Sequence, residues 1–259
     1  MTRIPKRLHY VWIGNDEKPE IFHKCLKSWQ EKMPDYEIVE INEKNFDLEK
    51  HIEKNSFLRE CYKRNLWAYI ADYVRIHYLY EHGGIYLDTD MEIVKDVSPL
   101  FENKNVDFFT GYESDDGIGM GLFGVAAKSE FLKKMINFYD DEIYASPLFT
   151  LPQITKYVLK RYFMCDFSKN EIKNNENGIY IYRKEYFYPF LPNQKFSESM
   201  IKEDTYAVHW WHHSWKGSRP FLYLKTKHLK GIKKCIKKIG IYFQIVRDDF
   251  RNRKAKNKN

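Results

Sequence analysis

The spacing of hydrophobic and polar residues predicts alternating strands and helices along most of the chain. Short β-rich runs that end at turn residues predict strands, and apolar residues at helical spacing predict helices. The predicted strands cover residues 8–13, 36–41, 85–87, 91–94, 106–111 and 178–182, and the predicted helices cover residues 21–32, 66–82 and 152–162. This order favours an α/β fold with a mostly parallel sheet flanked by helices, and such sheets bind ligands at the carboxyl ends of their strands.

Composition excludes a chain that is largely disordered or that spans a membrane. Aromatic residues make up 17% of the 259 residues, and no apolar run approaches the ~18 residues that a membrane-spanning helix needs. The N-terminal residues lack the apolar segment of a secretory signal. The four cysteines lie far apart in the sequence and match no zinc or redox spacing. We therefore expect a cytoplasmic protein with reduced thiols.

Positive charge is concentrated at the C-terminal end. Residues 225–259 hold thirteen Lys and Arg against two Asp and Glu, a local net charge of +11 within a chain total of +7. Residues 1–224 therefore carry a net charge of −4, and they show no basic stripe that would bind nucleic acid. We expect two parts, a main domain at residues 1–224 and a basic tail at residues 225–259.

The tail has the pattern of an amphipathic helix. Its apolar residues are spaced by three and four positions and so share one helical face: Leu229, Ile232, Ile236, Ile239, Phe243 and Val246. Lysines lie mostly off that stripe, and residues 251–259 form a basic end that we expect to be disordered. A basic amphipathic helix of this kind binds anionic membrane surfaces. The alternative is a helix that docks its apolar face on the main domain.

The tripeptide Asp88-Thr89-Asp90 directly follows the strand predicted at residues 85–87. Two carboxylates at positions i and i+2 converge where the chain bends at a strand end, and their hard oxygens suit Mn²⁺ or Mg²⁺. A cation at that place would neutralise a diphosphate leaving group. By itself, however, the tripeptide is also common in ordinary solvated turns.

The helix predicted at residues 66–82 carries a second pair of charged residues. Asp72 and Arg75 stand at i and i+3, so their side chains project together. Their neighbours on this helix are mostly apolar, which indicates burial, and a buried ion pair needs further partners or a functional role. The alternative is a surface salt bridge, which would stabilise the helix by only about 0.2–0.5 kcal/mol.

Taken together, several blocks of the sequence resemble the DXD-containing sugar transferases. The similar blocks are residues 4–14, Ser28-Trp29, Pro34-Asp35-Tyr36, 71–75, 80–90 and 207–215. The family includes bacterial polysaccharide glycosyltransferases of family 32, yeast-type initiating mannosyltransferases and, more distantly, the large clostridial glucosylating toxins. No single block is specific, but their combination and order are.

The resemblance implies a GT-A fold, a nucleotide-sugar donor (in the first place a UDP-sugar), Mn²⁺ or Mg²⁺ as cofactor, and transfer with retention of anomeric configuration. It implies that Trp12 stacks on the donor base and that Asp72 and Arg75 contact the donor sugar and diphosphate. Asp88 would face the ribose and the sugar and would reach the cation directly or indirectly, and Asp90 would bind the cation directly. From the resemblance, we expect the catalytic residues to be Asp72, Arg75, Asp88 and Asp90.

Three histidines and three tryptophans gather at residues 209–215. We expect His209 to end the last strand beside the acidic pair and to be a third metal ligand, because imidazole is a common ligand for borderline metals. Ser214 and Trp215 match the family's Ser-Trp pair, whose O–H and N–H groups suit phosphate oxygens. The alternative is an aromatic core with surface histidines, and the roles of His212 and His213 stay open.

The acceptor side is less defined by the sequence. Glu113, Asp115 and Asp116 follow a predicted strand and are candidates for a covalent nucleophile, for contacts with acceptor hydroxyls or for plain solvent exposure. The glycine-rich run 117–121 lacks the Lys-Ser/Thr of a phosphate-binding loop, and we expect it to line the acceptor channel. Relatives that build polysaccharides suggest a lipid-linked glycan acceptor in capsule or cell-surface synthesis, on the inner face of the cell membrane.

Two other classes of protein remain as alternatives. An aspartyl phosphatase also uses Asp-x-Asp, but Glu92 stands where that motif carries Thr or Val. A non-catalytic sugar-binding module would not require Asp72, Arg75 and the acidic pair together. We therefore expect a retaining, metal-dependent glycosyltransferase, and metal-dependent hydrolysis of nucleotide sugars separates it from a binding module.

Overall fold

The computed structural model describes residues 3–14, 16–102, 104–174, 176–212 and 220–256. Its strands are β1 (Arg7–Val11), β2 (Glu37–Ile41), β3 (Gly84–Leu87), β4 (Met91–Ile93), β5 (Phe108–Tyr112), β6 (Ile118–Val125), β7 (Ile172–Asn174), β8 (Ile179–Tyr182) and β9 (Ala207–His209). Its α-helices are α1 (Glu20–Lys32), α2 (Leu48–Lys54), α3 (Ser56–Tyr62), α4 (Trp67–His82), α5 (Glu130–Asn137), α6 (Leu151–Phe163), α7 (Pro220–Thr226) and α8 (Gly231–Lys256). Short 3₁₀ or π segments lie at Ser98–Leu100, Phe138–Glu142, Lys184–Tyr186 and Glu198–Met200.

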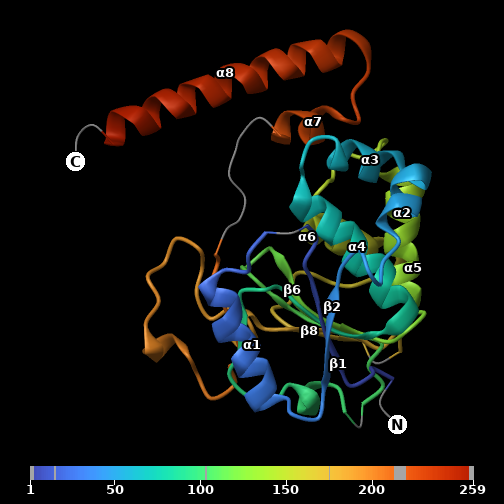
Figure 1. The fold of residues 1–259 in the computed structure, drawn as a ribbon, viewed down its shortest axis with the longest axis vertical. Helices are drawn as coiled ribbons and strands as arrows, with labels where there is room; N and C mark the ends of the chain where they lie inside the picture. Colours follow the sequence, from blue (N-terminus) through green and yellow to red (C-terminus); the bar gives the residue numbers. More distant parts are fainter. Residues whose placement is uncertain (1–2, 15, 103, 175, 213–219, 257–259) are drawn as a thin grey trace.

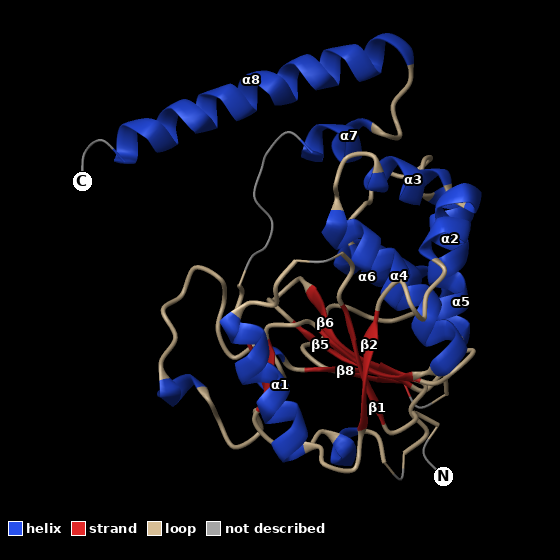
Figure 2. Ribbon diagram, viewed as in Figure 1, coloured by secondary structure: helices blue, strands red, loops and turns tan. Residues whose placement is uncertain are grey.

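A seven-stranded sheet with the order β2-β1-β3-β6-β5-β8-β7 forms the centre of the molecule. β1 pairs in parallel with β2 and β3, and β5 pairs in parallel with β8. β6 runs antiparallel to both of its neighbours, β3 and β5, and β7 runs antiparallel to β8. β4 and β9 form a separate antiparallel pair. The predicted α/β fold with a mostly parallel, helix-flanked sheet is therefore confirmed (Figure 2). The pairing directions place the ends of β1, β3 and β5 at the same sheet edge.

Every strand and helix predicted above corresponds to an element of the structure. The central strand β6 is not among them, because its glycines interrupt the apolar pattern by which strands are recognised. Instead of a loop, the glycine-rich run leads into this strand, which is buried along its whole length. Burial on both faces explains why β3 and β5 read as nearly continuous apolar runs rather than alternating ones.

Two hydrophobic cores lie on the two faces of the sheet. One joins the sheet to α3, α4, α5 and α6, and the other joins it to α1 and to β4 (Figures 1 and 2). α4 contacts α3, α5, β1 and β3, so it is enclosed on most sides. It ends at Gly83, whose φ of 63° lies in the left-handed region. Because α4 is enclosed, its charged residues Asp72 and Arg75 lie inside the protein.

The C-terminal part begins inside the main body. α7 runs across the boundary expected at residue 224: Leu224 is fully buried, and Lys227 Nζ donates to the carbonyl oxygens of Ile143 and Ser146. α8 then extends away from the sheet (Figure 1). It includes residues 251–256, which we expected to be disordered, because Arg, Lys and Ala there favour a helix. Of the helices in the described ranges, none has both the length and the apolar character needed to cross a bilayer.

Candidate functional site

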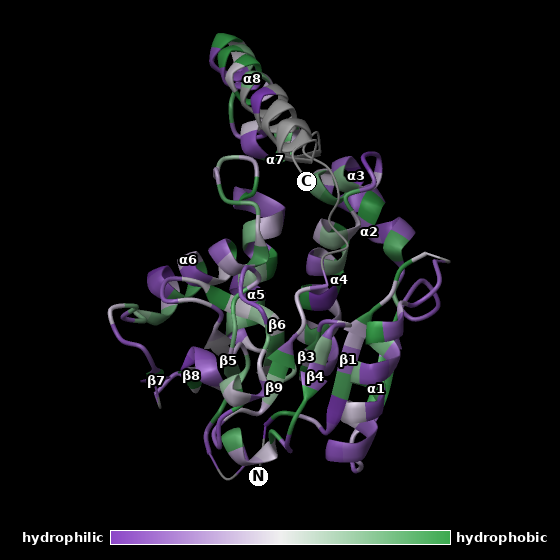
Figure 3. Ribbon diagram, turned by 90° about the vertical axis from the view of Figure 1, so that its left-hand side faces the viewer, coloured by the Kyte–Doolittle hydropathy of each residue, from purple (hydrophilic) through white to green (hydrophobic). Residues whose placement is uncertain are grey.

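Three potential metal-ligating side chains meet at the carboxyl end of β3. Asp88 follows β3, Asp90 precedes β4, and His209 ends β9, where it pairs with Met91 of β4. One ligand atom from each of the three lies within 4.8 Å of the other two. β3, β4 and β9 lie side by side in Figure 3. The structure thus places His209 beside Asp90, as the sequence predicts.

A tight turn, braced by α1, brings the two aspartates together. The N–H of Met91 donates to the carbonyl oxygen of Asp88 at 2.9 Å and closes a β-turn. The indole N–H of Trp29 donates to the carbonyl oxygen of Met91 at 2.6 Å, and Ile93 N–H donates to Ser28 Oγ at 2.9 Å. The Ser28-Trp29 dipeptide therefore holds β4, and with it the turn that carries Asp90.

Asp90 is held in its ionised form by its neighbours. His209 Nε2 lies 3.1 Å from Asp90 Oδ1, and the backbone N–H of His212 donates to Oδ2 at 2.7 Å. The chain turns at Trp211, with a φ of 55°, just before this N–H. Burial alone would raise the pKa of Asp90, but the bonds to His209 and to the His212 N–H lower it below its usual value. Burial would lower the pKa of His209, but Asp90 raises it.

The donor set of this cluster fits a divalent cation. Two carboxylates and one imidazole supply oxygen and nitrogen ligands of the kind that Mn²⁺ and neighbouring metals accept. Nδ1 of His209 is buried and has no hydrogen-bond partner among the residues that the structure describes. The ring nitrogen that faces the carboxylates is Nε2, 3.1 Å from Asp90 Oδ1, so a cation held with Asp90 would bind this nitrogen.

Arg75 links the metal cluster to Asp72. Its Nη1 lies 3.0 Å from Asp88 Oδ1, and its Nη2 lies 3.3 Å from Asp72 Oδ1. Nη1 also donates to the carbonyl oxygen of Met120 at 3.2 Å, and the guanidinium lies 4.1 Å from the centre of the Tyr86 ring. Burial raises the pKa of Asp72 to about 6, against the opposing effect of Arg75. The predicted Asp72–Arg75 pair is therefore a buried one, and its further partner is Asp88.

Two glycines of β6 leave room beside Asp88. A Cβ on Gly121 would lie 2.9 Å from Asp88 Oδ2, and a Cβ on Gly119 would lie 2.2 Å from the Tyr188 ring. The hydroxyl oxygen of Tyr188 accepts the N–H groups of Gly121 at 3.0 Å and Leu122 at 3.2 Å. Asp88 N–H donates to the carbonyl oxygen of Gly121 at 2.6 Å. Tyr188 thus holds the segment of β6 that positions Asp88.

Sequence reasoning missed this role of Tyr188. The available signal is the period of two in Gly117, Gly119 and Gly121, which leaves one strand face without side chains. Such a face indicates that something bulky approaches it. The identity of that neighbour could not be predicted, because Tyr188 is distant in the sequence.

Trp12 directly follows β1, the parallel neighbour of β3, and therefore lies at the same sheet edge as Asp88. Its ring is partly buried, lies 6.4 Å from the Phe22 ring and has Lys18 Nζ 5.6 Å from its centre. Its indole N–H donates to the carbonyl oxygen of Asp16 at 3.0 Å. These contacts leave part of the ring accessible to a ligand.

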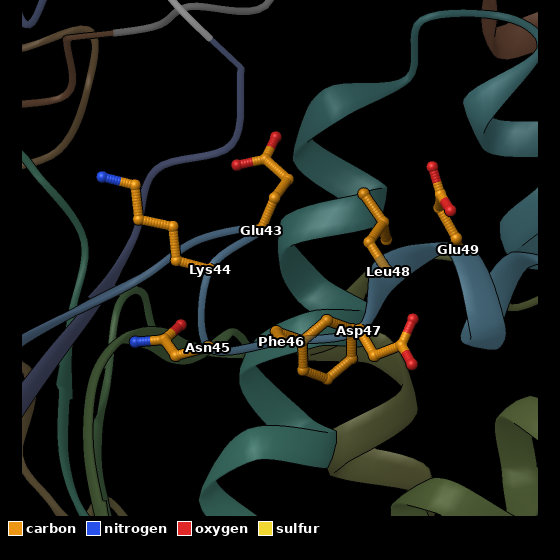
Figure 4. A pocket seen from close by; sticks show the side chains of 7 residues that line it. All are labelled: Glu43, Lys44, Asn45, Phe46, Asp47, Leu48 and Glu49. Atoms are coloured by element: carbon orange, nitrogen blue, oxygen red, sulfur yellow. The ribbon is translucent and has the colours of Figure 1, made fainter.

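A shallow hollow lies at the carboxyl end of β2, the next strand along this edge. It is lined by residues 43–49 (Figure 4). Glu43 on its rim accepts the N–H of Gly14 at 2.8 Å, which ties the hollow to the loop after Trp12. It contains none of the predicted site residues. Ser214 and Trp215, expected to bind phosphate, and His213 lie outside the described residues.

Comparisons with known proteins bear on this arrangement. Residues 19–107, which include Asp72, Arg75, Asp88 and Asp90, match the model of the glycosyltransferase sugar-binding region containing a DXD motif. The chain is 31% identical over 135 residues to inositol phosphoceramide mannosyltransferase 3 of Schizosaccharomyces pombe. This aligned region covers 51% of this chain and 36% of the relative. It is also 29% identical over 108 residues to the initiation-specific alpha-1,6-mannosyltransferase of Candida albicans. That aligned region covers 39% of this chain and 28% of the relative.

Solved structures of two glycosyltransferases are also similar to this chain. One is the PaToxG glycosyltransferase, with a TM-score of 0.46, 18% identity, and coverage of 61% of this chain and 68% of that one. The other is a glycosyltransferase involved in the glycosylation of the major capsid of PBCV-1, with a TM-score of 0.45, 11% identity, and coverage of 92% and 100%.

The sequence matches have a limited extent. The chain spans about a third of the length of the curated relatives that it matches. The matched region nevertheless contains the helix α4 with its ion pair, the strand β3 and the acidic turn, which are the elements that build the site. Over residues 19–107, this chain is thus similar to the glycosyltransferase sugar-binding region that contains a DXD motif.

Proposed function

We propose that the chain transfers a sugar from a nucleoside diphosphate sugar to a glycan acceptor, with retention of anomeric configuration and with a divalent cation. The observation that carries this proposal is the convergence of Asp88, Asp90 and His209 within 4.8 Å, beside the buried Asp72–Arg75 pair. A sugar-binding module without catalysis has no need for a cation site next to a fixed arginine.

The side chains divide the work by position. Asp90 and His209 hold the cation, and Asp88 completes the set from the side of the sugar. A bound cation would neutralise the charge that develops on the leaving diphosphate. Arg75 orients Asp88, because its Nη1 lies 3.0 Å from Asp88 Oδ1 while Asp72 and the Met120 carbonyl oxygen hold the guanidinium in place. Contact between Arg75 and the donor stays a prediction.

Mn²⁺ is the cation that we propose first. Mg²⁺ strongly prefers oxygen ligands, whereas the nitrogen of His209 suits a transition metal, and Mn²⁺ accepts both. The ligand atoms come from three different strand ends, so the site depends on the fold rather than on one segment.

The donor base would stack on Trp12, one strand away from Asp88. Stacking tolerates every nucleobase, because each has a π face. UDP-sugars are the donors that we test first, and the names of the two curated relatives make a nucleotide-activated mannose the second choice.

We further propose that the acceptor is a lipid-linked glycan of cell-surface polysaccharide synthesis. The name of one relative refers to inositol phosphoceramide, a lipid, as the molecule that receives mannose. An acceptor carried by a lipid requires the enzyme to work at a membrane surface, and α8 offers a means of binding there.

The apolar stripe of α8 faces solvent over the described side chains. Its members are 57–78% exposed: Ile232, Ile236, Ile239 and Phe243. α8 contacts α7, and Ile241, which lies off the stripe, is buried. Figure 3 shows hydrophilic and hydrophobic residues together on the coloured part of α8. Lysines beside an exposed apolar stripe match an anionic lipid surface in both charge and hydropathy.

The activity is tested by incubating the purified chain with UDP- and GDP-sugars in Mn²⁺, in Mg²⁺ and in a chelator. We expect hydrolysis of at least one donor in Mn²⁺ and none in the chelator. Retention is checked by the anomeric configuration of the product formed on an added sugar acceptor. A chain that binds nucleotide sugars but never cleaves them would instead be a binding module.

A further inference from the structure

Glu113 is an acidic residue near the metal cluster that has no role in the scheme above. It follows β5, and because β5 runs parallel to β3, Glu113 lies at the same sheet edge as Asp88. Its backbone N–H donates to the carbonyl oxygen of Gly117 at 2.9 Å, which closes the loop between β5 and β6. Its side chain is partly buried, and among the described residues no donor or cation contacts its carboxylate.

The electrostatic surroundings of Glu113 are those of the metal cluster. Burial is the main cause that raises its pKa to about 7, while His209 lowers the pKa and Asp88 raises it. Glu113 also raises the pKa of Tyr188, the residue whose hydroxyl group holds β6. A carboxylate that is removed from water without a donor is costly, and a ligand with hydroxyl groups would remove that cost.

The other two acidic residues of this loop are different. Asp115 is 89% exposed in its side chain and forms an ion pair with Lys184 at 2.7 Å. Asp116 is exposed, and its backbone carbonyl accepts from Lys156 at 2.7 Å. Of the three candidates that the sequence leaves open, Glu113 is therefore the one that is partly buried and interacts electrostatically with His209 and Asp88.

The order of strands places Glu113 relative to the donor. Trp12, Asp88 and Glu113 follow β1, β3 and β5, and the sheet order at this point is β1-β3-β6-β5. Neighbouring strands lie about 4.8 Å apart, so β5 lies about 10 Å from β3, on the side away from β1. A donor with its base at Trp12 and its diphosphate at Asp88 extends its sugar across β6 toward Glu113. Gly119 and Gly121 lie on β6, the strand between β3 and β5.

We propose that the carboxylate of Glu113 binds hydroxyl groups of the sugar that is transferred, and so contributes to the choice of donor. This inference rests on the proposed function, because it takes the metal cluster as the place of the diphosphate. Sugar hydroxyls would donate hydrogen bonds to this carboxylate, which has no protein donor among the described residues.

The test compares Glu113→Gln with Asp115→Asn, a matched loss of charge two residues away at an exposed position. Affinities are measured in Mn²⁺ for the nucleotide sugar that the unaltered chain hydrolyses and for the matching nucleoside diphosphate. We expect Glu113→Gln to weaken binding of the nucleotide sugar by at least about tenfold, the effect of one charged hydrogen bond, and binding of the diphosphate far less. Asp115→Asn should change neither.

The outcomes separate this inference from the function on which it rests. If Glu113→Gln weakens both ligands equally, or weakens neither, the sugar contact is wrong while the glycosyltransferase assignment stands. Absence of nucleotide binding by the unaltered chain would overturn both. Circular dichroism and the melting temperature of each variant show whether it folds, and Glu113→Asp provides a charged variant with a shorter reach that should recover part of the affinity.

Discussion

The carboxyl edge of the sheet and the helix α8 differ in whether their side chains find partners within the protein. At the sheet edge, Asp90 is bound by His209 and by a backbone N–H, and Arg75 is bound by two carboxylates. On α8, the apolar residues Ile236 and Phe243 are 64% and 68% exposed. The first region pairs these charged groups with other groups of the protein, and the second leaves its apolar side chains exposed to solvent.

This difference indicates where each region finds its partner. A site in which charges are already paired and oriented is prepared for a small ligand, because little reorganisation is needed on binding. An exposed apolar stripe with lysines around it lowers its free energy only by contact with another surface. We therefore assign the small-molecule chemistry to the sheet edge and the larger partner to α8.

The strongest test of this division changes one atom at the sheet edge. Asp90→Asn keeps the size of the side chain but removes its charge, so the fold should survive and the cation should be lost. Partners of metal ligands alone cost about 10–100-fold, so we expect loss of a direct ligand to lower transfer more than about a hundredfold. Transfer is measured in Mn²⁺, with Asp115→Asn as control. Near-normal turnover of Asp90→Asn would remove Asp90 from the metal site.

The second test removes α8 and leaves the sheet edge intact. We place the cut after Leu229, because Leu224 and Lys227 belong to the packed body. Each Lys or Arg near an anionic leaflet contributes about 1 kcal/mol, so the shortened chain should bind phosphatidylserine vesicles at low salt at least about tenfold more weakly. Its donor hydrolysis should equal that of the full chain. An insoluble or inactive product would show that α8 belongs to the body.

Two point variants sharpen this second test. Ile236→Asp places a charge on the apolar stripe, and Cys235→Asp places the same charge at the neighbouring exposed position. Vesicle sedimentation should show a larger loss for Ile236→Asp, because only that variant disrupts apolar contact with lipid. Equal losses of vesicle binding by the two variants would show that the helix binds the membrane by charge alone. A dimer seen by light scattering without lipid would identify a second copy of the chain as the partner.

The third test addresses the donor end of the sheet edge. Base stacking on an aromatic side chain contributes about 1–3 kcal/mol, so Trp12→Ala should weaken binding of the nucleoside diphosphate by about 5- to 150-fold. Trp67→Ala is the matched control, because Trp67 is 47% exposed on α4 and packs on Tyr62 rather than at the sheet edge. Calorimetric titration of UDP and GDP measures the effect. Unchanged affinity for both would exclude Trp12 from the base site, provided that its melting temperature is unchanged.

The smallest expected effect concerns pH. Burial raises the pKa of Glu113 from 4.5 to about 7, so the folded chain binds this proton more tightly than the unfolded chain does. Between these values the unfolded state holds fewer protons, and the contribution of Glu113 to stability therefore falls as the pH rises. Glu113→Gln should be more stable than the unaltered chain at pH 8, with a difference that shrinks toward pH 5. Urea unfolding at several pH values measures this difference, and a constant gap would contradict it.

Much of the site can be predicted from the sequence, because its parts lie close together along the chain. The spacing of Asp72 and Arg75 predicts their pairing, and the turn after a buried strand predicts that Asp88 and Asp90 converge. Helical and strand periods likewise predict the elements of the sheet except β6 and the short edge strand β7. The prediction fails for β6 because glycines remove the side chains by which a strand is recognised.

Contacts between distant segments could not be predicted in this way. The sequence leaves Glu113, Asp115 and Asp116 equivalent, and only the packing of the loop between β5 and β6 leaves Glu113 partly buried and the other two exposed. The bond from Arg75 to Asp88 and the support of β6 by Tyr188 depend on how strands from different parts of the chain pair. The role of His212 was open because its backbone N–H, rather than its imidazole, reaches Asp90.

The sequence by itself therefore determined the local elements, the ion pair of α4, the acidic turn and the amphipathic character of α8, since each follows from side chains a few positions apart. The tertiary structure alone decided that Arg75 reaches Asp88, that Glu113 rather than Asp115 or Asp116 is partly buried, and that the stripe of α8 stays exposed. These outcomes depend on the order of strands in the sheet and on the packing of helices around it, and no local period in the sequence carries that information.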